Sequence, residues 1–68
     1  MEDEVKLFAC EPITGDLIDL ETARAMRLPL SHGWDHYAVF KGRKLLRRFY
    51  NFRVAISFAT RNGLKLAA

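Results

Sequence analysis

The feature that most constrains the fold is a strand-turn-strand-helix pattern between Asp35 and Gly63. Tyr37–Phe40 is rich in strand-favouring residues, and strand character resumes over Leu45–Tyr50. The intervening Lys41–Arg43 supplies a turn glycine. This order predicts a β-hairpin followed directly by a helix.

The helix has a recognisable start and end. Asn51 can accept a backbone N–H as an N-cap, and Asn62-Gly63 is suited to a left-handed C-cap. We expect Leu64 to fold back onto Ala59 or Phe58, as residues after such caps often do. Apolar residues recur between the caps at the spacing of an amphipathic helix: Phe52, Ala55, Ile56 and Ala59.

The N-terminal half predicts further strands. Val5–Cys10 contains enough β-formers for a strand with Val5, Leu7 and Ala9 on one face. Glu11–Asp16 contains proline and glycine and reads as a turn, after which Leu17 and Ile18 form a short return strand.

A short first helix follows, from Leu20 to about Arg27, with Asp19 as its N-cap. Leu28-Pro29 ends it, because a residue before proline is pushed out of the helical region. The fold class is therefore α+β: one small domain over residues 1–68, with the short helix and the C-terminal helix packed on an antiparallel sheet of three to four strands. Residues 1–4 are expected to be mobile, and residues 64–68 to be a frayed tail or a short added strand.

Length and composition narrow the class further. A 68-residue chain buries only about 60% of the surface that it exposes when unfolded, so the core is small and homodimerisation stays open. The single cysteine, Cys10, excludes an internal disulfide framework. No apolar run reaches the roughly 18 residues of a membrane span, and the acidic start is unlike a secretory signal. We expect a cytoplasmic protein with no membrane partner.

Charge is divided unevenly along the chain. Residues 1–35 carry eight acids and three bases, a net −5, whereas residues 36–68 carry eight bases and no acid, a net +8. Such a division indicates a polarised surface that attracts an anionic partner. The alternative is that the two halves neutralise each other within the fold.

The basic half predicts a binding surface. Clustered cations neutralise phosphates, and neighbouring aromatic rings can stack on bases. The expected nucleic-acid or anion contacts are Lys41, Arg43, Lys44, Arg47, Arg48 and Arg53. The expected stacking or partner-anchoring residues are Trp34, Tyr37, Phe40 and Tyr50. A turn rich in lysine and arginine is also a common solvated edge that discourages aggregation, so solvation alone remains an alternative.

Arg53 adds a second indication of an anion site. It falls in the first turn of the predicted second helix, where a positive charge opposes the helix macrodipole by about 0.3–1 kcal/mol. A phosphate or carboxylate would be favoured there by the free N–H groups. We therefore expect an anionic group near Asn51 to Arg53.

The basic pattern resembles a known architecture. The order of Gly42, Arg48-Phe49 and then Ala55, Phe58 and Ala59 is similar to the three-stranded-sheet-plus-helix DNA-binding domains of the phage-integrase arm-binding type, over about residues 36–62. The resemblance implies a sheet in the major groove with the helix behind it. It also implies that Arg43, Lys44, Arg47 and Arg48 face DNA. This chain departs from that type by its additional helix and acidic half.

Catalysis is poorly supported by the sequence. His32, Asp35 and His36 lie close together and could be joined by Cys10 as metal ligands, but Gly33 and the loop setting deny them a fixed helical face. We therefore expect no enzymatic activity, no metal, no cofactor and no small-molecule substrate.

The sequence predicts non-enzymatic binding, with DNA favoured over RNA as the partner. The competing class is a regulatory protein-interaction module, or an inhibitor of the kind that phages encode, which binds an acidic protein surface. In that case Trp34 and the aromatic-arginine strand face would dock on the partner, as aromatic hot spots do.

Overall fold

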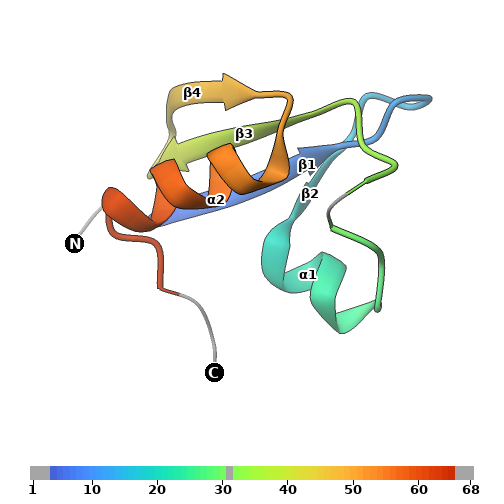
Figure 1. Ribbon diagram of the computed structural model, residues 1–68, viewed down its shortest axis with the longest axis horizontal. Coiled ribbons are helices and arrows are strands. Elements are labelled where there is room, and N and C mark those ends of the chain that lie inside the picture. Colours follow the sequence, from blue (N-terminus) through green and yellow to red (C-terminus); the bar gives the residue numbers. More distant parts are fainter. Residues whose placement is uncertain (1–3, 31, 66–68) are drawn as a thin grey trace.

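The computed structural model describes residues 4–30 and 32–65 (Figure 1). Its elements are β1 (Val5–Cys10), β2 (Leu17–Asp19), α1 (Leu20–Ala25), β3 (His36–Lys41), β4 (Lys44–Phe49) and α2 (Phe52–Arg61). The hairpin, both helices and the N-terminal strands all lie where the sequence predicts them.

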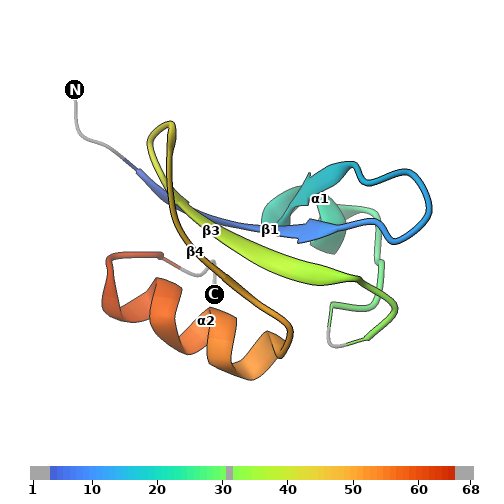
Figure 2. The same cartoon turned by 90° about the horizontal axis from the view of Figure 1, so that it is seen from above.

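The strands form one antiparallel sheet in the order β2-β1-β3-β4. This four-stranded sheet with two helices confirms the expected small α+β fold. The hairpin strand β4 lies at one edge, and its register with β3 shifts at Val39/Phe40, where Leu46 forms a β-bulge. Figure 2 shows α2 along one side of β3 and β4, whereas α1 lies by β1 and β2.

The core lies between the sheet and α2. Alternate residues of β1 and β3 point toward the helix, because successive side chains of a strand face opposite ways. Ala55 and Ala59 are fully buried, which lets α2 approach the sheet closely. The buried cluster comprises Val5, Leu7, Ala9, Leu20, Tyr37, Val39, Ala55 and Ala59.

Helix α2 is capped as the sequence predicts. The Asn51 side chain accepts a hydrogen bond from the Val54 N–H at 3.2 Å. At the other end Gly63 adopts a positive φ of 114°, and the Leu64 N–H donates to the Ala59 carbonyl at 2.9 Å. Leu64 packs against the core, so the chain after the helix is held as far as this residue.

Helix α1 ends at Ala25, two residues before the predicted end at Arg27. Arg27 adopts a left-handed φ of 59°, and the Leu28 N–H donates to the Ala23 carbonyl at 2.9 Å. The left-handed residue Arg27 ends the helix. The helix therefore stops before it reaches Leu28-Pro29, which was predicted to end it. Asp19 occupies the predicted N-cap position, but its side chain makes no capping hydrogen bond.

The predicted mobile ends are described only in part. Residues 1–3 and 66–68 lie outside the described residues. Glu4 is tied to the hairpin turn, because its carbonyl accepts a hydrogen bond from the Gly42 N–H at 2.9 Å.

Candidate nucleic-acid interface

The sheet face opposite α2 is here called the open face. Strand alternation and register place on it Lys6, Phe8 and Cys10 from β1, His36, Ala38 and Phe40 from β3, and Leu45 and Arg48 from β4. Leu20 of α1 and Ala55 and Ala59 of α2 belong to the buried cluster on the other side. Within the described residues, α1 contacts only β1 and β2. The part of the open face over β3 and β4, here called the hairpin half, therefore has no described helix over it.

Two aromatic pairs lie on the open face. The rings of Phe8 and Phe40 are 5.3 Å apart and nearly perpendicular, at 84°. Those of His36 and Tyr50 are 6.3 Å apart. Tyr50 is 85% exposed, whereas Phe8 and Phe40 are half-buried. Exposed ring faces on a sheet are suited to stacking against unpaired bases.

Cations surround these rings on the hairpin side. Lys6 and Arg48 lie on the open face, in rows that also hold Phe40 and Phe8. The hairpin turn adds three exposed cations, Lys41, Arg43 and Lys44. None of the described lysine and arginine side chains forms an ion pair with a described carboxylate. The described acidic residues therefore leave these cations available to solvent or to an anionic partner.

Acidic groups lie at the other side of the same face. Asp19 is the β2 residue paired with Phe8, and Asp35 immediately precedes β3, at the end of that strand far from the hairpin turn. The face is thus polarised, with positive charge along β4 and the turn. A polyanion would be attracted to the hairpin half and repelled from the β2 edge.

The six predicted cations do not form a single patch. Arg48 is on the open face, but Arg47 is paired with Val39, whose side chain faces the core. The Arg47 guanidinium lies 5.6 Å from the Phe49 ring centroid. Arg53 is exposed in the first turn of α2, on the helix side of the sheet. Strand alternation separates Arg47 from Arg48, and the turn into α2 carries Arg53 to the helix side of the sheet.

Two of the predicted aromatic contacts, Tyr37 and Trp34, pack against the core. Tyr37 is only 3% exposed and cannot stack on a ligand, so its assignment as a stacking residue is wrong. Strand alternation places Tyr37 on the helix side, where its hydroxyl donates to the Leu30 carbonyl at 2.7 Å. Burial raises the pKa of the Tyr37 phenol. The half-buried Trp34 packs against the core and donates its Nε1–H to the Pro29 carbonyl at 2.6 Å.

Phe8 and Lys6 were missed by the sequence argument, although a signal for them exists. The alternation that assigns Val5, Leu7 and Ala9 to the core also assigns Lys6 and Phe8 to the opposite face. Nothing in the sequence shows which strand lies beside β1, however. The register that brings Phe8 to Phe40 is known only from the structure.

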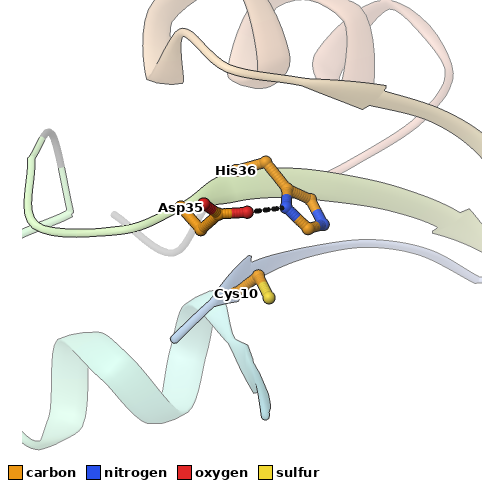
Figure 3. A group of neighbouring side chains, drawn as sticks. All are labelled: Cys10, Asp35 and His36. Atoms are coloured by element: carbon orange, nitrogen blue, oxygen red, sulfur yellow. Dashed lines mark hydrogen bonds and ion pairs between the residues drawn. The ribbon is translucent and has the colours of Figure 1, made fainter. Parts of the chain in front are cut away.

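A second group of functional side chains meets at the end of β1 and the start of β3 (Figure 3). Donor atoms of Cys10, Asp35 and His36 lie within 4.8 Å of one another. His36 Nδ1 is 2.8 Å from Asp35 Oδ2. The Cys10 thiol makes long contacts to the carbonyls of Glu11 and Gly15, at 3.8 and 3.7 Å. The sequence indicates a loop without a fixed geometry for these residues, whereas the sheet register pairs Cys10 directly with His36.

No protein family, curated protein or solved structure matches this chain. The resemblance to the arm-binding type of DNA-binding domain therefore stays a prediction. Within the described residues, no helix has the length and apolar character needed to cross a membrane.

Proposed function

We propose that this protein binds single-stranded nucleic acid on the hairpin half of the open face. Bases stack on Tyr50 and on the Phe8–Phe40 pair, and phosphates lie against Arg48, Lys6 and the hairpin turn. The observation that carries the proposal is a sheet face, not covered by either described helix over β3 and β4, that displays aromatic rings among cations that pair with no described carboxylate. The protein acts by binding and performs no catalysis.

A single strand is favoured over a duplex by the position of the rings. Bases can stack on a protein side chain only when they are not already stacked within a helix. The rings of Phe8 and Phe40 lie within the sheet surface, so a base must be brought to them. DNA remains the expected form of the nucleic acid, with RNA of the same sequence as the comparison.

The test is fluorescence anisotropy of a labelled oligonucleotide of mixed sequence, titrated at several salt concentrations. Tyr50→Ala should lower the binding free energy by about 1–3 kcal/mol, the usual value of one stacked base. Arg48→Gln should reduce the slope of log K against log salt by about 0.7, the value for one phosphate contact on a single strand.

A matched control is Arg24→Gln in α1, which removes the same charge from a helix that contacts only β1 and β2. This variant should bind almost as the wild type does. The proposal is refuted if no oligonucleotide binds, or if Arg24→Gln and Arg48→Gln weaken binding equally. Equal affinity for duplex and single strand, with no effect of Tyr50→Ala, would also refute it.

An acidic protein segment is the competing partner class, since it could pair with the outer edge of β4. The bulge at Leu46 interrupts the regular ladder of that edge, and such bulges are a common protection against added strands. Lys44, Arg47 and Arg48 further discourage pairing with a neutral strand. In the same assay an acidic peptide that displaced the oligonucleotide from wild type and Tyr50→Ala with equal affinity would favour this class.

A further inference from the structure

The geometry points to a binding site for Zn²⁺ formed by Cys10, Asp35 and His36. This site is separate from the contacts proposed for nucleic acid, and it rests on different residues. Three kinds of donor, a thiol, a carboxylate and an imidazole, have atoms within 4.8 Å of one another (Figure 3).

The backbone holds these three residues in place. Cys10 and His36 are direct partners in the β1–β3 register, on the open face. Asp35 is joined to the same point, because its N–H donates to the Cys10 carbonyl at 2.9 Å. Cys10 and His36 are therefore fixed by the sheet, and the backbone of Asp35 is tied to it, which lowers the cost of assembling a metal site.

The donor types select the class of metal. A thiolate and an imidazole suit zinc and related transition ions, whereas magnesium and calcium prefer oxygen ligands throughout. Three protein ligands leave one position of a tetrahedral ion for water. The site therefore fits a zinc ion with an open coordination position.

Small side-chain movements are enough to admit the ion. Donors around a tetrahedral zinc ion are about 3.4 Å apart, as follows from bond lengths of about 2.0–2.3 Å. The 2.8 Å contact between Asp35 and His36 must therefore open slightly, and the Cys10 thiol must approach. The Asp35 side chain is 57% exposed and has room to move.

Binding a metal would cost the Cys10 thiol only weak hydrogen bonds. Its contacts to two carbonyl oxygens are long, at 3.7 and 3.8 Å, and a thiol is a weak donor. Binding the ion removes the thiol proton to solvent, as thiolate ligation requires. The metal then compensates the charge of the bound thiolate, at a residue that is only 7% exposed.

The experiment is titration of the reduced full chain with Co²⁺, which reports thiolate ligation through a charge-transfer absorption in the near ultraviolet. We expect saturation at one ion per chain and displacement by an equal concentration of Zn²⁺ but not by Mg²⁺. Zn²⁺ should also raise the melting temperature, because an ion that binds only the folded state stabilises it.

Variants identify the ligands. Cys10→Ala should abolish the absorption. Asp35→Asn removes one of the three charged or imidazole ligands and should weaken Co²⁺ binding by more than the roughly 10–100-fold that loss of a merely supporting carboxylate costs. His36→Gln should weaken it at least as much, whereas His32→Gln, which removes the other histidine, should not. Circular dichroism confirms that each variant is folded.

Two results would overturn the inference. One is a wild-type chain without thiolate absorption, or without a zinc-dependent melting shift, at Co²⁺ and Zn²⁺ concentrations well above that of the protein. The other is binding that persists in Asp35→Asn and His36→Gln but is lost in His32→Gln. Displacement by Mg²⁺ would show that the metal class is wrong.

Discussion

Replacing Arg27 by glycine tests the backbone conformation at the end of α1. The stability order of the glycine and alanine variants should be opposite at Arg27 and at an ordinary helical position. Arg27 has a left-handed φ of 59°, a conformation that costs an ordinary L-residue about 1–2 kcal/mol. Its side chain is exposed, so little packing is lost on substitution. Glycine removes this conformational cost. It also makes the unfolded chain more flexible, which lowers the stability by about 0.4–1 kcal/mol. We expect the free energy of unfolding of Arg27→Gly to be about 0.5–1 kcal/mol higher than that of Arg27→Ala.

The comparison with alanine separates conformation from charge, because both variants lose the same guanidinium. Arg24, three residues earlier and helical, is the matched position. There the order should reverse, with Arg24→Gly less stable than Arg24→Ala by about 1 kcal/mol. Urea unfolding followed by circular dichroism measures each pair, and 1 kcal/mol corresponds to about 4–8 °C in melting temperature for a domain of this size. Equal stability of the two Arg27 variants, or the same order at both positions, would refute the left-handed assignment.

Two further predictions concern the caps and the core. Asn51→Ala removes the hydrogen bond to the Val54 N–H and should lower the free energy of unfolding by about 1 kcal/mol, whereas Asn51→Asp should retain the stability; urea titration distinguishes them. The raised pKa of the buried Tyr37 phenol means that the folded state keeps its proton where the unfolded state loses it. Stability should therefore be complete below pH 10.0 and fall as the pH rises above that value, a fall that Tyr37→Phe should reduce.

The elements of this fold were predictable because their signals are local. The hairpin depends on a turn glycine, and Gly42 adopts the positive φ of 62° that such a turn requires. Helix α2 is marked by Asn51, by its apolar spacing and by Gly63. The end of α1 was not predictable in this way, because Arg27 takes a conformation that its residue type disfavours.

The candidate site was predictable only in part, because it depends on which strands are neighbours. The cations of the hairpin are adjacent in sequence, so their exposure could be anticipated. Phe8 and Phe40 are distant in sequence and meet only because β1 lies between β2 and β3. Cys10 meets His36 for the same reason. Tyr37 was taken for a stacking residue because a strand with aromatic residues on both faces does not show which face is buried.

The two proposed sites share the open face, and this leads to a prediction about both. His36 contacts Tyr50 at 6.3 Å between ring centroids, and Cys10 is two residues from Phe8 on the same strand. The two positive charges of bound zinc would offset the carboxylate of Asp35 and the thiolate of Cys10, so binding would remove the negative charge of Asp35 from beside the stacking surface. We expect Zn²⁺ to strengthen oligonucleotide binding by about 5-fold or more, and by linkage the oligonucleotide to strengthen zinc binding by the same factor.

Anisotropy titrations with and without Zn²⁺ measure this coupling, and Cys10→Ala in the same solutions controls for zinc bound by the oligonucleotide itself. A zinc effect of equal size in the wild type and in Cys10→Ala would show that the ion acts through the nucleic acid. If each site binds its own ligand but zinc leaves the affinity for the oligonucleotide unchanged, then the bases do not approach Tyr50 and His36. The strand would in that case be confined to the hairpin end, beside Phe40, Lys6 and the turn cations, where the positive charge is densest and Asp35 is farthest away.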